Sequence, residues 1–176
     1  MNLFLTGSIQ IGKSTVLKKA LQALTAEQNL RLGGFYTFHI PNCRDVFIAE
    51  YGTEPVIDDA HRIATWQGNN MLPHDEVFNK LGVSLLEKAE QADWIIMDEL
   101  GFLEKNAMEF QEKVLQCLRE QTPCIGVLRK GPIVWQKPIY QMPDLKIFEV
   151  TLKNRETLPQ KIFQLLQQSS LPSHQK

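Results

Sequence analysis

The stretch that decides the fold is Gly7-Ser8-Ile9-Gln10-Ile11-Gly12-Lys13-Ser14, which lies within the segment LTGSIQIGKST at residues 5–15. It matches the phosphate-loop pattern G-x-x-x-x-G-K-[ST] at every fixed position. The apolar run at residues 2–6 before it predicts a buried strand, and the helical spacing of apolar residues from 13 to about 27 predicts an amphipathic helix. This order of strand, loop and helix is typical of a P-loop nucleotide-binding site.

The fixed positions of the loop have distinct chemical roles. Gly7 lets the chain turn sharply out of the strand, and Gly12 lets the backbone approach phosphates without an intervening side chain. Successive backbone N–H groups then point at the anion, together with the N-terminus of the helix. We expect Lys13 to reach the β- and γ-phosphates and the Ser14 hydroxyl to bind Mg²⁺.

The variable positions of the loop are compatible with nucleotide binding. They supply backbone N–H groups, and Gln10 is expected to need a positive φ, at a cost on the order of 1 kcal/mol that phosphate contacts can offset. Thr15 is next in line and is placed to touch the α-phosphate. The predicted nucleotide-binding residues of the loop are therefore Gly7, Ser8, Ile9, Gln10, Ile11, Gly12, Lys13, Ser14 and Thr15.

A second strand, DWIIMDE at residues 93–99, ends on acidic residues. Asp98 at its carboxyl end fits the Walker B position, from which an Asp holds Mg²⁺. Glu99 is placed to orient and deprotonate an attacking water. For Glu104, a capping role at the start of the next helix is the alternative to a catalytic one.

The rest of the chain alternates strand and helix patterns. A β-hairpin around Pro41 follows the first helix, and further strands are predicted at CIGVLR and KIFEVTL. Helices are predicted near residues 76–91, 106–121 and 156–168, and a loop with three prolines joins the last two strands. Residues 52–75 have no clear pattern beyond room for one short strand. These elements predict an α/β domain with a mostly parallel sheet between helices.

Length and composition are those of one globular domain. The chain has 176 residues, and we expect a single P-loop domain at residues 1–168 and a flexible tail at 169–176. The formal net charge of −1 gives no electrostatic reason to expect a nucleic-acid partner. No apolar run suggests a membrane span or a signal peptide. Three cysteines without a CxxC pair fit reduced thiols, so we expect a cytoplasmic protein.

The combined motifs resemble the THEP-type P-loop nucleoside-triphosphatase family. The resemblance lies in LTGSIQIGKST, in GGFYT after the first helix, in IIMDELGFLE and in VTLKNRE before the last helix. It covers most of the chain except residues 52–75. It implies Mg²⁺-dependent hydrolysis of several nucleoside triphosphates to diphosphate and phosphate, with weak base preference.

The resemblance also implies roles for particular residues. Asn154 and Arg155 occupy the family's NR position, where they would face the base. The family commonly has a Lys where this chain has Phe102. Arg129 and Lys130 are the candidates to supply that charge, and Arg129 would act as a catalytic cation on the γ-phosphoryl group, with a plain surface position as the alternative.

Two other functions remain open from the sequence. The same loop and metal site serve kinases, but the loop at 131–144 carries a single cation, Lys137, where kinase lids usually carry several arginines. A nucleotide-dependent switch that binds a partner protein is the other alternative. The physiological substrate, the base preference and any protein partner do not follow from the sequence.

Overall fold

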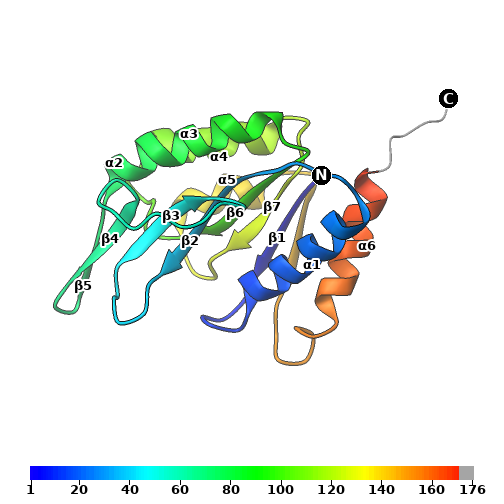
Figure 1. The fold of residues 1–176 in the computed structure, drawn as a ribbon, viewed down its shortest axis with the longest axis horizontal. Helices are drawn as coiled ribbons and strands as arrows, with labels where there is room; N and C mark the ends of the chain where they lie inside the picture. Colours follow the sequence, from blue (N-terminus) through cyan, green and yellow to red (C-terminus); the bar gives the residue numbers. More distant parts are fainter. Residues whose placement is uncertain (171–176) are drawn as a thin grey trace.

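The computed structural model describes residues 1–170 as a mixed sheet with helices on both faces (Figure 1). The eight strands lie in the order β5-β4-β3-β2-β6-β7-β1-β8. Strands β2, β6, β7, β1 and β8 pair in parallel, whereas β3, β4 and β5 extend the sheet with antiparallel pairs. The predicted fold class is therefore confirmed: a mostly parallel P-loop-type sheet with a hairpin after the first helix.

The elements have the following bounds. The strands are β1 (Asn2–Thr6), β2 (Leu32–His39), β3 (Val46–Glu50), β4 (Arg62–Gln67), β5 (Asn70–Pro73), β6 (Trp94–Leu100), β7 (Cys124–Leu128) and β8 (Leu145–Glu149). The helices are α1 (Lys13–Glu27), α2 (Asp75–Val77), α3 (Val83–Lys88), α4 (Met108–Arg119), α5 (Lys137–Tyr140) and α6 (Leu158–Ser170), with a π-helical turn at Phe78–Gly82 between α2 and α3. None of the helices within residues 1–170 is both long and apolar enough to span a bilayer.

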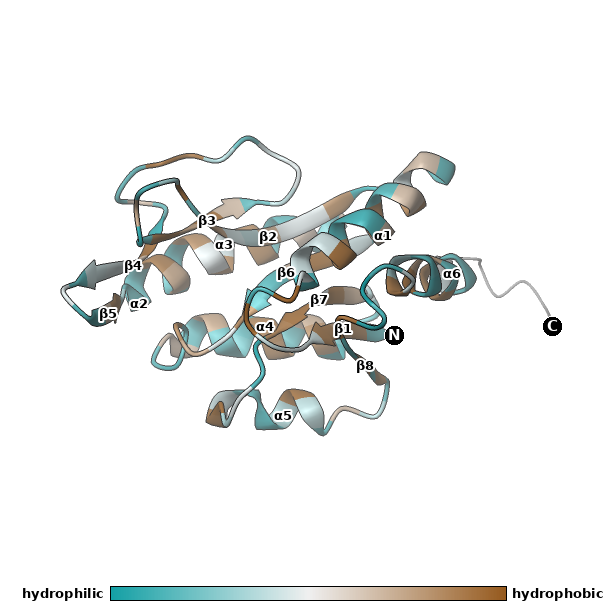
Figure 2. Ribbon diagram, turned by 90° about the horizontal axis from the view of Figure 1, so that it is seen from below, coloured by the Kyte–Doolittle hydropathy of each residue, from teal (hydrophilic) through white to brown (hydrophobic). Residues whose placement is uncertain are grey.

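The core has two layers, one on each face of the sheet. Successive side chains of a strand point to opposite faces, so Leu3 and Leu5 pack under α1 and α6 while Phe4 packs under α3 and α4. The strands are apolar on both faces, as expected for a parallel sheet covered by helices. The helices α1 and α6 carry both hydrophobic and hydrophilic residues (Figure 2), because each covers the sheet with one face only.

Three segments differ from the sequence prediction. Residues 52–75 contain two strands, β4 and β5, at the end of the sheet far from α6 (Figure 1). The proline-containing segment between β7 and β8 is not a plain loop, because it forms a 3-10 turn at Val134–Gln136 and the short helix α5. The last helix extends to Ser170, and the remainder of the expected tail, 171–176, lies outside the described residues.

The parallel strands deliver their carboxyl ends to one edge of the sheet. Strand β1 ends before Gly7, β6 ends at Leu100, β7 ends before Arg129, and β2 ends at His39. Ligands of open parallel sheets bind at this edge. The fold therefore brings the predicted loop, the acidic strand end and the candidate cation to one place.

Candidate active site

The phosphate loop adopts the strained backbone that its sequence predicts. Gly7 and Gly12 have φ values of 144° and 102°, and Gln10 has a φ of 58°. The positive φ expected at Gln10 is thus confirmed. A β-carbon on Gly7 would lie 2.6 Å from the Val150 carbonyl oxygen, so glycine is needed there for the close approach of β8 as well as for the turn.

Lys13 is held inside the loop. Its side chain is 8% exposed, and its Nζ donates to the carbonyl oxygens of Ser8 at 3.0 Å and Gly7 at 3.3 Å. These contacts fold the lysine back over the loop instead of leaving it in solvent. The ammonium group therefore lies where the loop backbone would hold the terminal phosphates.

The side chains of Ser14 and Asp98, the two predicted metal ligands, meet across the site. The Ser14 hydroxyl donates to Asp98 Oδ1 at 2.9 Å. Burial raises the pKa of the Asp98 carboxyl to about 6, and the nearby Glu99 adds to the shift. A hard divalent cation prefers oxygen donors of this kind and would supply the missing positive charge. The two residues therefore fit Mg²⁺. Within residues 1–170 no cluster of three or more His, Cys, Asp or Glu side chains offers a different metal site.

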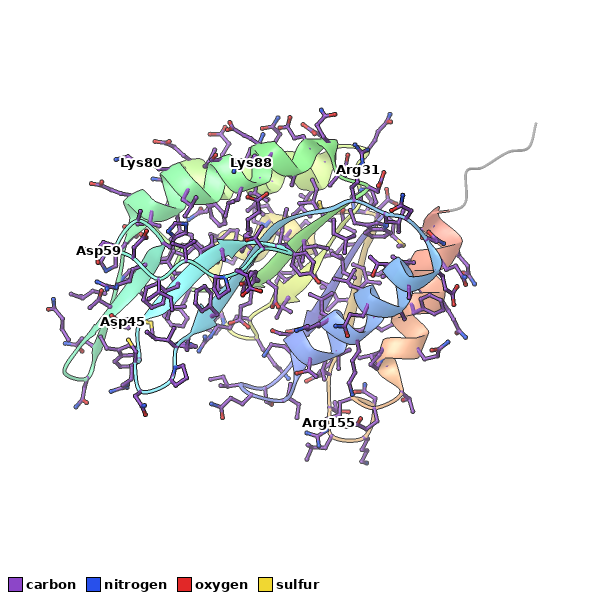
Figure 3. All side chains as sticks on the ribbon, viewed as in Figure 1. Arg31, Asp45, Asp59, Lys80, Lys88 and Arg155 are labelled. Atoms are coloured by element: carbon purple, nitrogen blue, oxygen red, sulfur yellow. The ribbon has the colours of Figure 1, made fainter. Side chains whose placement is uncertain are left out.

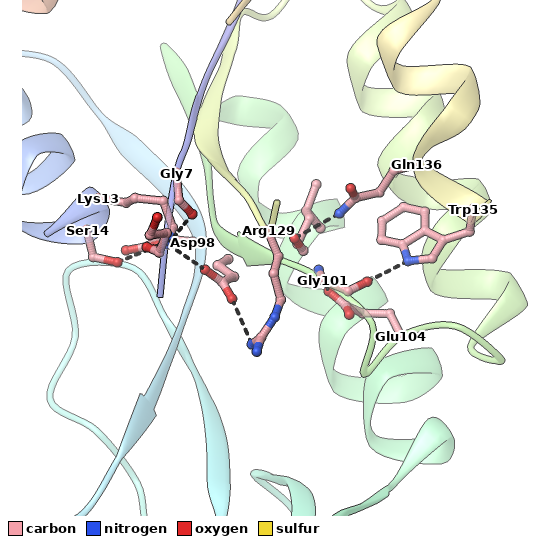
Figure 4. Close-up of polar contacts among 12 residues, drawn as sticks. Gly7, Lys13, Ser14, Asp98, Gly101, Glu104, Arg129, Trp135 and Gln136 are labelled. Atoms are coloured by element: carbon pink, nitrogen blue, oxygen red, sulfur yellow. Dashed lines mark hydrogen bonds and ion pairs between the residues drawn. The ribbon is translucent and has the colours of Figure 1, made fainter. Parts of the chain in front are cut away.

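Glu99 lies between two cations, Lys13 and Arg129, both of which are labelled in Figure 4. Its Oε2 is 3.9 Å from Lys13 Nζ, and its Oε1 accepts from Arg129 Nη1 at 3.4 Å. The regular pairing of β6 with β7 breaks between Met97 and Leu100, and the Asp98–Glu99 peptide is cis. The carboxylate thus joins the loop lysine to the arginine that follows β7.

Arg129 and Lys130 have different surroundings. The Arg129 guanidinium lies 4.5 Å from the centre of the Phe102 ring, whereas Lys130 pairs with Glu149 at 2.6 Å. Phe102 stands where the family commonly has a Lys, so the Arg129 cation lies beside that position. Of the two candidates, Arg129 contacts Glu99 and Lys130 does not.

Glu104 belongs to the turn after β6 and is 2% exposed. Its Oε1 accepts from the Gly101 backbone N–H at 2.8 Å, and burial raises the pKa of its carboxyl to about 7. The same turn is held from the β7–β8 segment, because Trp135 Nε1 donates to the Gly101 carbonyl at 2.7 Å and Gln136 Nε2 donates to that of Leu100 at 2.9 Å (Figure 4). This segment therefore packs on the turn.

Asn154 and Arg155 lie in the loop between β8 and α6, outside the phosphate-loop cluster. Asn154 Oδ1 accepts from the Thr151 N–H and its Nδ2 donates to the Glu149 carbonyl, both at 2.8 Å, so the side chain stabilises its own loop. Arg155 is exposed on the outside of the loop (Figure 3) and lies 3.3 Å from Glu156 Oε1. Neither residue lines a hollow that contains Lys13.

A hollow of about 600 Å³, here called the phosphate pocket, contains most of the predicted residues. Ile11 is the loop residue that does not line this pocket, because its side chain packs against the core layer under α1 and α6. The pocket is lined by Gly7–Gln10, Gly12–Thr15, Thr37, His39, Asp98, Glu99, Arg129 and Lys130. Thr37 and His39 were not predicted, although they alternate along a strand next to β6, which is the signal that could have placed them at this edge. Tyr51 is not part of this lining, and burial together with the charge of Asp98 raises the pKa of its hydroxyl.

Similar proteins share nearly the whole length of the chain. "Nucleoside-triphosphatase THEP1" of Thermotoga maritima is 28% identical over 171 residues, which cover 94% of this chain and 95% of the relative. The protein of the same name from Methanosarcina barkeri is 27% identical over 172 residues, which cover 92% and 95% of the two chains.

Two solved structures have the same fold. The crystal structure of THEP1 from Aquifex aeolicus superimposes with a TM-score of 0.77 at 22% identity and covers 94% of this chain. The superposition includes 99% of the Aquifex aeolicus chain. The solution structure of a human cancer-related nucleoside triphosphatase gives 0.71 at 24% identity, covering 96% of this chain and 98% of that one.

The family assignment rests on the sequence itself. The sequence model described as NTPase matches residues 2–163, which include the phosphate loop, the acidic strand end and Arg129. The resemblance predicted from the motifs is thereby confirmed. This chain belongs to the NTPase family, with the THEP-type nucleoside-triphosphatases among its relatives.

Proposed function

We propose that this protein hydrolyses nucleoside triphosphates, among them ATP and GTP, to the diphosphate and phosphate with Mg²⁺ and weak base preference. The observation that carries the proposal is the placement of Glu99 between Lys13 and Arg129. A carboxylate at this position can take a proton from water, while two cations lie where negative charge would develop.

Binding rests on the loop and the metal ligands. Backbone N–H groups of residues 8–13 bind the phosphate oxygens, and Lys13 contacts the β- and γ-phosphates. Ser14 and Asp98 would hold Mg²⁺, which would supply charge neutralisation for the phosphates.

The chemical step rests on three side chains. Glu99 accepts the proton of a water as its oxygen bonds to the γ-phosphorus. The bond from the γ-phosphorus to the bridging oxygen breaks, and the diphosphate leaves with the electron pair. Arg129 and Lys13 stabilise the charge on the transferring group, so this chain needs no arginine from a partner.

The test is phosphate release from ATP, GTP, CTP and UTP with no acceptor present. We expect slow release from all four that stops when the metal is chelated. Glu99→Gln should slow release about 100-fold or more, because general-base assistance is lost, while nucleotide affinity stays similar. Lys13→Ala should abolish release. Glu109→Gln, which changes an exposed acid on α4, is the matched control.

Three outcomes would contradict the proposal. Release that occurs only after an acceptor is added would identify a kinase. Tight nucleotide binding without turnover under either condition would identify a switch. An unchanged rate in Glu99→Gln would remove Glu99 from the mechanism.

A further inference from the structure

A second hollow of about 600 Å³, here called the side pocket, adjoins the phosphate pocket. Its lining comes from β2, β3, β4 and β5 and from the end of β6 with the turn after it, which includes Glu99 and Glu104. The two hollows share the residues Ile9, Gln10, Thr37, His39, Glu99 and Arg129. The shared wall therefore contains the carboxylate and the cation that face the terminal phosphate in the proposed function, on which this inference rests.

The side pocket has the lining of a site for a small organic molecule. Its base is apolar, with Ile63 and Phe78 fully buried in it. Trp66 and Phe102 add aromatic rings, each with a guanidinium over one face: Arg44 lies 3.6 Å from the Trp66 ring centre, and Arg129 covers Phe102. The rest of the lining is polar and includes Gln10, Thr37, His39 and four charged side chains. Pockets of this size that combine apolar and aromatic side chains with polar groups are typical of ligand sites. Water as a nucleophile requires no such space.

The wall of the side pocket is held in place by Asp45. The backbone N–H of Trp66 donates to Asp45 Oδ1 at 3.0 Å, and Arg62 Nε lies 3.5 Å from Asp45 Oδ2. Asp45, labelled in Figure 3, directly precedes β3, so these contacts join the start of β3 to β4. The aromatic wall is therefore built into the sheet instead of depending on a ligand to order it.

The charges of the side pocket fit an uncharged ligand. Its charged side chains are two guanidinium groups, Arg44 and Arg129, and two carboxyl groups, Glu99 and Glu104, and burial raises the pKa of the Glu104 carboxyl to about 7. Arg129 already pairs with Glu99 and Arg44 lies over the Trp66 ring, so both guanidinium groups already have partners, whereas a phosphorylated or acidic compound would need one to pair with. The aromatic rings favour a planar ring system, because such rings stack on aromatic side chains.

We propose that the side pocket binds a nucleoside-like alcohol, with an uncharged planar ring and a primary hydroxyl, and that the chain transfers the γ-phosphoryl group to it. The hydroxyl oxygen forms a bond to the γ-phosphorus, and Glu99 takes its proton. The bond from the γ-phosphorus to the bridging oxygen breaks, and the nucleoside diphosphate leaves with the electron pair. Transfer and hydrolysis then differ only in whether the alcohol or water lies next to Glu99.

The experiment supplies Mg²⁺ and ATP to the full chain with adenosine, guanosine, cytidine, uridine or thymidine. Mass spectrometry measures the nucleoside monophosphate, and free phosphate is measured in the same samples. We expect at least one nucleoside to be phosphorylated. Occupancy has an independent readout in Cys43, which lines the side pocket while Cys117 and Cys124 are buried. The accepted nucleoside should slow alkylation of Cys43 by N-ethylmaleimide.

Variants of Trp66 test the location. Trp66→Ala should lower the ratio of nucleoside monophosphate to free phosphate about ten-fold, because ring stacking is lost, and Trp66→Phe should restore most of it. Leu72→Ala, an exposed change on β5 beside the pocket residue Met71, is the control. Circular dichroism of each variant separates loss of transfer from loss of fold.

Each result decides the proposal. Phosphate release without any nucleoside monophosphate overturns it and leaves the hydrolase intact. Transfer that Trp66→Ala does not change overturns the assignment to the side pocket. Transfer without hydrolysis in the absence of nucleoside supports the acceptor site and contradicts the proposed hydrolase. Absence of both reactions overturns both.

Discussion

Glu104 is a buried acid whose titration should be visible in the stability of the protein. Burial raises the pKa of its carboxyl from 4.5 to about 7. Between these values the unfolded chain has lost the proton and the folded chain retains it, so the free energy of unfolding falls as the pH rises from about 4.5 to 7 and is level above. Glu104→Gln should remove this loss, which is on the order of 3 kcal/mol.

Denaturant unfolding of both proteins from pH 4.5 to 8.5 measures the effect. The glutamine can still accept from the Gly101 N–H, so the turn is retained. We expect the wild type to lose more stability than Glu104→Gln across the window. An equal loss of stability with pH in the two proteins would show that other groups of the folded protein offset the cost of ionising the buried carboxyl. Glu109→Gln, at an exposed position on α4, should follow the wild type.

Single residues show how far the sequence could predict the site. The left-handed Gln10 follows from the loop pattern, since the positions between two fixed glycines must turn around a phosphate. The burial of Glu104 does not follow from the local pattern, because the turn that holds it is packed by Trp135 and Gln136 from a later segment, through bonds to the Gly101 and Leu100 carbonyls. The base contact inferred for Asn154 stays a prediction, and its side chain bonds within its own loop.

At the scale of elements, Gly82 lets the segment before α3 approach α4 closely. A β-carbon at Gly82 would lie 2.7 Å from Cδ2 of the Phe110 ring. The Phe110 ring is fully buried and packs against Phe35 and Phe78, with ring centres 5.5 and 5.2 Å away, so a shift of this ring would disturb both neighbours. Gly82→Ala should lower the free energy of unfolding by about 1–2 kcal/mol, because overpacking exceeds the gain in helix propensity.

Denaturant unfolding also tests this prediction. Glu87→Ala, on the exposed side of α3, also introduces alanine but makes no contact with Phe110. It should change the free energy of unfolding by less than about 0.5 kcal/mol. The double variant Gly82→Ala with Phe110→Leu should show a smaller loss than the two single losses added together. A more stable Gly82→Ala would mean that helix propensity dominates at this contact.

Helices and parallel strands were predicted well because their apolar spacing is local. The run that became β6 and the amphipathic α4 both follow from it. The sequence pattern did not predict β4 and β5 as two strands, because their residues are mostly half-buried or exposed and the strands pair only with each other and with β3. The side pocket depends on these two strands, so the sequence pattern could not reveal it.

At the scale of the whole molecule, one ligand would join strands that are far apart in the sequence. The phosphate pocket draws on the ends of β1, β2, β6 and β7, all in one sheet. A nucleotide that binds only the folded chain adds about 2.7 kcal/mol of stability at 100 times its Kd. For a domain of this size that corresponds to an increase in Tm of roughly 5–10 °C.

Thermal unfolding with Mg²⁺ and a non-hydrolysable ATP analogue tests this linkage. We expect the Tm to rise in a single transition, since the two core layers share one sheet. Lys13→Ala should lose most of the ligand-induced rise, and the shift is compared with each protein's own ligand-free Tm because Lys13 also bonds Gly7 and Ser8. Lys80→Ala, an exposed lysine far from the pocket, should keep the full rise. A Tm rise that survives in Lys13→Ala would place the nucleotide outside the phosphate loop. A second transition whose Tm does not change with nucleotide would show that β3, β4 and β5 unfold separately from the strands that hold the ligand.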